Sequence, residues 1–209
     1  MRTLALDVDG VLLDSERNGA GHWTNELGRR YGITREQLRR AFFIPFWGDV
    51  VNGRMALEPA LAESLSIIGT SASVDQVIEC WFEADFVVID AAVDLAHRAA
   101  ATGVHVVLAT NQEHRRARFL CGRLGQLFLI RDVVYSADLG VQKHECVFFD
   151  LASERLNVNH MRSDVVFVDD LELNVQAATD AGWTAILATT EKNWIRQVGQ
   201  LLDLPATDL

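Results

Sequence analysis

Five short apolar runs recur along the chain and predict the strands of a sheet. Several runs are continuous rather than alternating, as expected for parallel strands covered by helices on both faces. Helical patterns over residues 115–124, 144–156 and 174–181 separate the later runs. This alternation predicts an α/β fold with a doubly wound parallel, Rossmann-like sheet. The five runs are Thr3 to Val8, Val104 to Ala109, Asp132 to Tyr135, Val165 to Val168 and Thr184 to Ala188.

The region between the first two runs lacks a strand pattern, and its apolar residues follow helical spacing instead. A helical insert after the first strand is the simplest explanation. We therefore expect an α/β core formed by residues 1–14 and 90–209 and a helical cap domain formed by residues 15–89. Aromatic residues at helical spacing form a core more often than they stack on a substrate. The tryptophans expected in the core of the cap are Trp23, Trp47 and Trp81.

The composition is that of an ordinary globular protein, with 209 residues, 49% of them hydrophobic and 23% charged. The formal net charge of −10 provides no general attraction for nucleic acid or an anionic membrane. No apolar run approaches the length of about 20 residues that a bilayer span needs, and no secretion signal is visible. We expect a cytoplasmic monomer or small homo-oligomer that binds neither nucleic acid nor membranes.

The three cysteines are far apart and form no C-x-x-C pair, so neither a disulfide framework nor a zinc site is predicted. They are expected to be small buried apolar residues.

Two carboxylates lie at the end of the first apolar run, in the sequence Asp7-Val8-Asp9-Gly10. Ligands of open α/β sheets bind at the carboxyl ends of the strands. Residues two apart on an extended chain point the same way, so Asp7 and Asp9 can both face this crevice. For a lone D-x-D-G pattern an Asx turn is the commoner interpretation.

Further polar residues follow the later strands and favour a functional site over a turn. Thr110 and Asn111 end the second run, where a hydroxyl and a turn backbone can bind an anion before a helix. Lys143 lies in the loop after the third run and can reach a phosphate oxygen. The pair Asp169-Asp170 ends the fourth run, and Asn174 follows four residues after Asp170.

Together these motifs resemble those of the haloacid dehalogenase-like hydrolase superfamily, in the phosphatase branch with a helical cap inserted after the first motif. The resemblance covers residues 3–14 and 90–190, whereas the cap resembles the family only in position and helical character. The residues that carry it are Asp7, Asp9, Gly10 and Val11, then Thr110, then Lys143, and finally Asp169 and Asp170.

The resemblance implies a catalytic role for two of these aspartates. Asp7 is implied to be the nucleophile that attacks phosphorus and becomes an aspartyl-phosphate. Asp9 is implied to act as general acid towards the leaving oxygen and then as base for the hydrolytic water. Thr110, the Asn111 backbone N–H and Lys143 are implied to bind the phosphoryl oxygens.

The resemblance also implies a Mg²⁺ cofactor, which relieves the repulsion between neighbouring carboxylates and the anionic substrate. Its expected ligands are the Asp7 carboxylate, the Asp9 backbone carbonyl and Asp170. Asp169 is expected next to the metal ligands rather than on the metal. Asn174 stands where the family usually has an aspartate, and its neutral amide can still orient a water.

We therefore expect a Mg²⁺-dependent hydrolase that acts on a small phosphorylated substrate, and three alternatives remain. A dehalogenase on this fold lacks the second aspartate of the first motif, which this chain has as Asp9. A phosphosugar mutase uses the same core and differs in the cap. A degenerate member could serve as a non-enzymatic ligand sensor, although every motif position carries a competent residue. Arg54 and Glu58, in the expected cap, are weak candidates for selecting the substrate.

Overall fold

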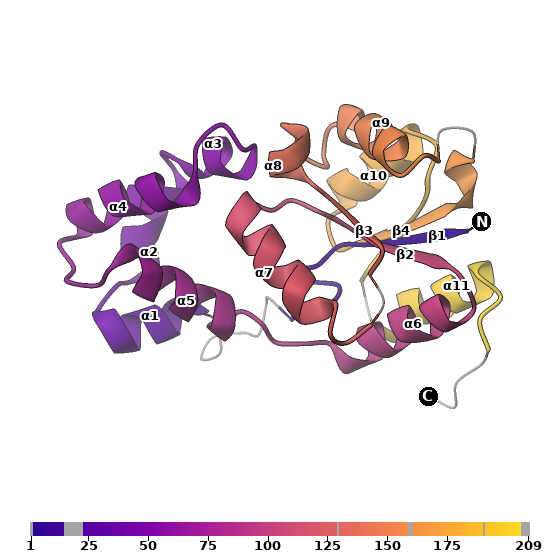
Figure 1. The fold of residues 1–209 in the computed structure, drawn as a ribbon, viewed down its shortest axis with the longest axis horizontal. Coiled ribbons are helices and arrows are strands. Elements are labelled where there is room, and N and C mark those ends of the chain that lie inside the picture. The colour runs from indigo at the N-terminus through magenta and orange to yellow at the C-terminus, as the bar shows by residue number, and fades with distance from the viewer. Residues whose placement is uncertain (1, 15–22, 129, 159–160, 190, 206–209) are drawn as a thin grey trace.

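A computed structural model describes residues 2–14, 23–128, 130–158, 161–189 and 191–205. The chain alternates between strands and helices after an early, purely helical stretch (Figure 1). The elements, in chain order, are β1 (Thr3–Leu6), α1 (Trp23–Tyr31), α2 (Arg35–Leu38), the π-helical turn η2 (Arg39–Phe43), α3 (Trp47–Val51), α4 (Leu57–Ile68), α5 (Val74–Ala84), α6 (Asp90–Ala101), β2 (His105–Thr110), α7 (His114–Leu124), β3 (Asp132–Tyr135), α8 (Ser136–Leu139), α9 (Cys146–Arg155), the 3₁₀ turn η3 (Arg162–Asp164), β4 (Val165–Asp169), α10 (Glu172–Asp180), β5 (Thr184–Leu187) and α11 (Glu191–Leu201).

The strands form one parallel sheet in the order β3-β2-β1-β4-β5. The first strand therefore lies at the centre, where Leu6 pairs with Leu108 on one side and Val168 on the other. All five predicted strands are present within the described residues, with ends that differ from the prediction by two residues at most. The predicted α/β, Rossmann-like fold is confirmed.

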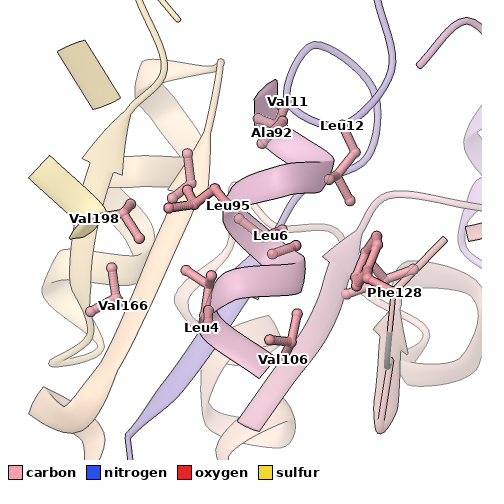
Figure 2. Close-up of a cluster of buried hydrophobic side chains, with 14 of the residues drawn as sticks. Leu4, Leu6, Val11, Leu12, Ala92, Leu95, Val106, Phe128, Val166 and Val198 are labelled. Carbon is pink, nitrogen blue, oxygen red and sulfur yellow. The ribbon is translucent and has the colours of Figure 1, made fainter. Parts of the chain in front are cut away.

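Helices cover both faces of the sheet, as the continuous apolar strands predict. Leu4 and Leu6 of β1 pack beneath α6, against residues that include Leu95 (Figure 2). Ala5, between them, points to the opposite face and packs in the cluster that contains Phe148 of α9. This alternation follows from the two-residue period of a strand. It keeps the end of β1 rigid on both sides.

Helices α1 to α5 gather into a separate lobe beside the sheet, which we call the helical lobe (residues 23–84; Figure 1). The lobe has its own apolar cluster, in which Trp23 and Trp81 are buried and Trp47 packs from the edge. The expectation that these tryptophans form a core is therefore confirmed. The division into residues 1–14 and 90–209 and residues 15–89 stays a prediction, and residues 15–22 lie outside the described part of the chain.

The two chain segments that join the lobe to the sheet are paired with each other. Asp14 N donates to Val87 O at 2.8 Å, and Ile89 N donates to Leu12 O at 2.9 Å. Leu13 forms an antiparallel bridge with Val88 and a parallel bridge with Asp9. The connection between lobe and sheet is thus hydrogen-bonded to the loop that carries Asp9.

Two further expectations can be compared with the structure. No helix within the described residues is long and apolar enough to cross a bilayer. The expectation that all three cysteines are buried is wrong, because only Cys80 is buried, whereas Cys121 is partly buried and Cys146 is exposed. Cys146 begins the surface helix α9, whose buried side is occupied by phenylalanines.

Candidate active site

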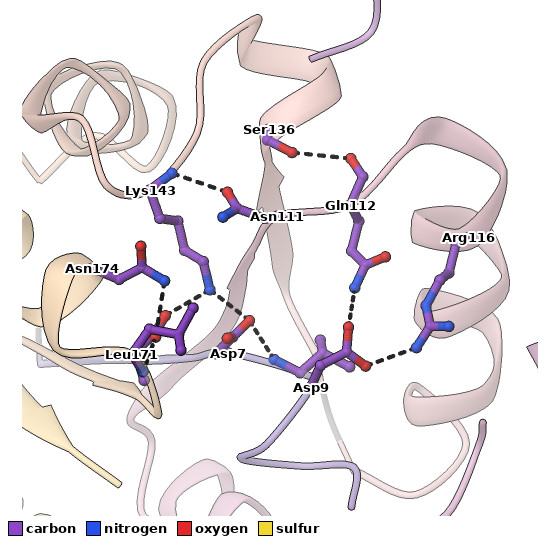
Figure 3. Close-up of polar contacts among 11 residues, drawn as sticks. Asp7, Asp9, Asn111, Gln112, Arg116, Ser136, Lys143, Leu171 and Asn174 are labelled. Atoms are coloured by element: carbon purple, nitrogen blue, oxygen red, sulfur yellow. Dashed lines mark hydrogen bonds and ion pairs between the residues drawn. The ribbon is translucent and has the colours of Figure 1, made fainter. Parts of the chain in front are cut away.

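The central strand places Asp7 at the carboxyl edge of the sheet. Asp7 N donates to Val168 O at 3.0 Å, which continues the pairing of β1 with β4 by one residue. The side chain is buried, and its Oδ1 accepts a hydrogen bond from Val8 N at 2.7 Å. The same oxygen lies 2.7 Å from Lys143 Nζ (Figure 3). Within the described residues, Oδ2 has no hydrogen-bond donor and is therefore available to a ligand.

Lys143 joins two carboxylates beneath the site. Its Nζ lies 2.6 Å from Asp169 Oδ2 as well as 2.7 Å from Asp7 Oδ1, and its side chain is only 1% exposed. Its backbone N–H donates to Asn111 Oδ1 at 3.0 Å, which fixes the loop before α9 against the loop after β2. Burial alone lowers the pKa of Lys143, but the charges of Asp7 and Asp169 outweigh it and raise that pKa. The lysine therefore stays charged.

Asp169 is fully buried and both of its oxygens are occupied. Oδ2 accepts from Lys143, and Oδ1 accepts from Leu171 N at 2.8 Å and from Asn174 Nδ2 at 3.0 Å. A carboxylate at position 174 would face Asp169 with like charge, whereas the Asn174 amide donates a hydrogen bond. Asn174, which replaces the usual aspartate, therefore forms a favourable contact with Asp169.

Asp170 lies beside Asp7 and Asp169, and their carboxylate oxygens include a set within 4.8 Å of one another. Gly10 makes this approach possible, because its φ is +80° and a Cβ there would collide with Asp170 Oδ2. Burial, and then the charge of Asp169, raises the pKa of Asp170. Burial also raises the pKa of Asp7 from 3.8 to about 8. This crowded set of hard oxygen ligands fits a divalent cation such as Mg²⁺.

Asp9 is held by two side chains that the sequence analysis did not identify. Gln112 Nε2 donates to Oδ2 at 2.6 Å, and Arg116 Nη2 donates to Oδ1 at 2.7 Å (Figure 3). Arg116 is buried and also forms an ion pair with Asp85, directly after α5 of the helical lobe. No local signal identifies these two side chains, because Gln112 lies in the loop before α7 and Arg116 is one of several arginines in that helix.

A cavity of about 200 Å³ brings the predicted residues together at the carboxyl edge of the sheet. Asp169 lies under it, where it binds Lys143. The lining residues are Asp7, Asp9, Thr110, Asn111, Lys143, Asp170, Leu171 and Asn174.

The two weak candidates in the helical lobe do not line this cavity. Arg54 forms an exposed ion pair with Asp49, and Glu58 pairs with Arg115 of α7. Their contacts are explained by the surface of the lobe and by its attachment to the core.

Comparison with known proteins settles the family. The sequence pattern of the haloacid dehalogenase-like hydrolases matches residues 1–182. The chain belongs to this family. The motif residues of this HAD-like hydrolase meet at the cavity described above. A search of curated protein sequences gives no significant match.

Solved structures share the fold of this HAD-like hydrolase at low sequence identity. A HAD family enzyme from Bacteroides thetaiotaomicron has a TM-score of 0.75 at 16% identity, over 95% of this chain and 98% of that one. Its complex with magnesium and inorganic phosphate gives a TM-score of 0.68 at 17% identity, over 94% and 98%. A dehalogenase gives 0.62 at 16% identity, over 96% of each chain. These likenesses support the fold of the whole chain.

Proposed function

We propose that this HAD-like hydrolase is a Mg²⁺-dependent phosphatase that acts on a small phosphorylated metabolite. The observation that carries the proposal is the 200 Å³ cavity, in which Asp7, Asp9 and Lys143 meet around a space fit for a phosphoryl group. Asp7 presents an oxygen that no donor in the described residues occupies, and Thr110 and Asn111 also line the cavity. The structural neighbour that binds magnesium and phosphate is consistent with this chemistry.

In the first step, an Asp7 oxygen attacks phosphorus, and the bond from phosphorus to the leaving oxygen breaks. Asp9 donates a proton to the leaving oxygen, so the product departs as an alcohol. Lys143 compensates the charge of the transferred phosphoryl group as Asp7 becomes an aspartyl-phosphate. Thr110 and Asn111 orient the phosphoryl oxygens.

In the second step, Asp9 removes a proton from water, and the hydroxide oxygen attacks phosphorus and releases Asp7 and inorganic phosphate. Gln112 suits both protonation states of Asp9, because its amide offers a donor to the carboxylate and, when turned, an acceptor to the carboxylic acid. Arg116 holds the other oxygen in place. Asp9 can therefore change its protonation state without losing its orientation.

The cation would be held by the carboxylates of Asp7 and Asp170 and the backbone carbonyl of Asp9. When bound, Mg²⁺ would neutralise carboxylate charge and polarise the phosphoryl oxygens. Asp169 is less suited as a ligand, because both of its oxygens already accept hydrogen bonds. This engagement supports the expected choice of Asp170 over Asp169.

The rival reactions make different demands on Asp9. A dehalogenase needs no general acid to protonate a leaving alkoxide. We consider this rival because a dehalogenase is among the structural neighbours. Here Asp9 lies at the cavity, held by Gln112 and Arg116. Halide release from a 2-haloacid would favour the dehalogenase. Formation of a hexose 6-phosphate from hexose 1-phosphate would favour the phosphosugar mutase. A ligand sensor would release neither product.

The test of the proposal is Mg²⁺-dependent release of phosphate from a generic chromogenic phosphoester. We expect wild-type turnover to require Mg²⁺ and Asp7→Asn to lower kcat by at least about 10³-fold, because the amide is not a nucleophile. Asp150→Asn is the matched control, since Asp150 is an exposed residue of α9 paired with Arg162. Activity of Asp7→Asn above a tenth of wild type would exclude Asp7 as the nucleophile.

A further inference from the structure

A second cavity, of about 400 Å³, adjoins the cavity that contains Asp7. The two cavities share Asp9 and Asn111. If Asp9 protonates the leaving oxygen, as the proposed function requires, the leaving group extends from Asp9 into this second cavity, which we call the leaving-group cavity. Its lining residues are Asp9, Trp23, Thr24, Arg35, Arg39, Phe43, Trp47, Trp81, Asp85, Asn111, Gln112 and Arg116.

Aromatic rings form much of the wall of the leaving-group cavity. Trp23 and Trp81 stack with ring centroids 4.6 Å apart and an interplanar angle of 16°. Phe43 and Trp47 meet edge to face at 5.6 Å, and both are only half-buried. Rings that are incompletely covered by the protein can stack on a further ring. The wall therefore suits a flat ligand.

Two buried donors in this wall have no acceptor. Trp81 is 5% exposed and Arg116 is 3% exposed, yet Trp81 Nε1 and Arg116 Nε have no hydrogen-bond partner within the described residues. A buried donor without a partner costs about 1–3 kcal/mol. Both atoms are covered by the protein itself, so an acceptor of a bound ligand reaches them only after the wall shifts. The aromatic wall is the observation that points to a flat occupant.

The charged groups of the cavity also limit its occupant. Arg116 is neutralised by Asp9 and Asp85, and Arg39 is paired with Glu36. Arg35, which is exposed, has no ion pair within the described residues and can bind an acceptor of the ligand. A polyol would need many donors and acceptors around it, whereas a ring with a few acceptors matches a largely aromatic wall with sparse polar groups.

We propose that the leaving group is a small planar alcohol with an aromatic or heteroaromatic ring that carries hydrogen-bond acceptors. The substrate class is thus a phosphomonoester of a ring-bearing alcohol rather than a polyol phosphate. Hydrolysis adds water across the P–O bond and yields the free alcohol and inorganic phosphate. The inference rests on the proposed phosphatase function.

Pyridylmethyl phosphate and glycerol phosphate provide the first test, because both are esters of an alkyl alcohol and so differ little in intrinsic reactivity. With Mg²⁺, we expect kcat/KM to be at least about tenfold higher for pyridylmethyl phosphate, a factor within reach of aromatic stacking and one hydrogen bond. Equal values, or a preference for glycerol phosphate, would overturn the proposal.

Phe43→Leu tests the aromatic wall, and Phe46→Leu is its matched control. Phe46 is also a half-buried phenylalanine of the lobe, but it lines a different cavity. We expect Phe43→Leu to lower the preference for pyridylmethyl phosphate about threefold to tenfold, through KM, as the loss of one ring contact implies. Phe46→Leu should leave that preference unchanged. An equal effect of both substitutions would contradict the assignment.

A binding measurement separates failure of this inference from failure of the proposed function. Pyridylmethanol, the product alcohol, should quench the tryptophan fluorescence of the metal-free wild-type protein saturably, whereas glycerol should not. If neither phosphoester is hydrolysed but pyridylmethanol quenches, the phosphatase proposal fails and the ring-binding cavity stands. If phosphate is released but pyridylmethanol does not quench at concentrations above KM, the ring-binding cavity is wrong.

Discussion

At the residue scale, the side chains around Asp7 carry more negative than positive charge. The carboxylates of Asp7, Asp169 and Asp170 lie together, and Lys143 is the cation that contacts two of them. Burial strengthens their mutual repulsion, because water screens it poorly there. A bound proton or a bound metal ion can relieve the excess, and the two should compete.

This competition predicts that Mg²⁺ binding releases a proton. Burial raises the pKa of Asp7 to about 8 in the metal-free protein, so at pH 7 the site holds about one proton that the metal must displace. Titration calorimetry at pH 7 in two buffers of different ionisation enthalpy measures this number. Identical heats in the two buffers would contradict the prediction.

The same pKa shift sets the pH dependence of stability. Between the unfolded pKa of about 4 and the folded pKa of about 8, folded metal-free protein binds a proton that unfolded protein lacks. Its free energy of unfolding should therefore fall as the pH rises from 5 to 8. Saturating Mg²⁺ should reduce this decline. Urea unfolding with EDTA and with Mg²⁺ provides the measurement, and a metal-free stability that rises over this range would contradict it.

Gly10 controls how closely Asp170 approaches the first motif. Gly10→Ala places a methyl group against Asp170 Oδ2 and also requires a non-glycine residue at φ +80°. We expect the Kd for Mg²⁺ to rise at least about tenfold, measured by calorimetry. Gly199→Ala in α11 is the control, because a Cβ there meets nothing within 4 Å. Wild-type Mg²⁺ affinity in folded Gly10→Ala protein would refute this role for Gly10.

At the element scale, α7 connects the sheet to the helical lobe. Its first turn follows the loop after Thr110, the last residue of β2, and its arginines reach across to acids of the lobe. Arg115 pairs with Glu58 and Asp75, and Arg123 pairs with Glu83. These pairs are largely exposed, so each contributes under about 1 kcal/mol. The buried Arg116 pair with Asp85 is the contact with a larger effect.

Asp85→Asn should lower the free energy of unfolding by about 1–3 kcal/mol, because the buried Arg116 then loses one of its two charged acceptors. Glu83→Gln is the control from α5 and should change it by less than about 1 kcal/mol, since its partner Arg123 is exposed. Urea unfolding monitors both variants. Equal destabilisation by both would contradict a special role for the buried pair.

The strands and the motif residues could be predicted from sequence because their signals are local. A continuous apolar run marks each buried strand, and Thr110 and Asp169 follow such runs directly, while Asp7 lies near the end of one. The partners of Asp9 could not be predicted in this way. Arg116 pairs with Asp9 and Asp85 only in the folded chain, and an arginine in a helix gives no sign of burial in its own sequence.

At the scale of the whole molecule, the leaving-group cavity is formed jointly by the lobe and the core, so access to it depends on their separation. We predict that the lobe acts as a cap that closes over the bound substrate. From the sequence we expect a hinge at residues 14–16, directly after the first motif, and of these Ser15 and Glu16 lie outside the described residues.

Small-angle scattering tests this closure. With Mg²⁺ and a phosphate analogue such as vanadate, we expect the radius of gyration to fall relative to the unliganded protein. Arg123→Ala, which removes an exposed contact between lobe and core, should increase the unliganded value or leave it unchanged. Identical scattering curves with and without the ligands would count against cap closure.

The paired connection between lobe and sheet would serve as the hinge axis of the predicted lobe closure. Leu13 bridges both Val88 and Asp9, so this hinge axis lies next to the residue proposed as acid and base, while Phe43 and Trp47 lie in the helical lobe. A small rotation about this axis would move the aromatic wall and leave the orientation of the Asp9 side chain nearly unchanged. Leaving groups of different thickness could then bind against the wall while Asp9 stays aligned with the leaving oxygen.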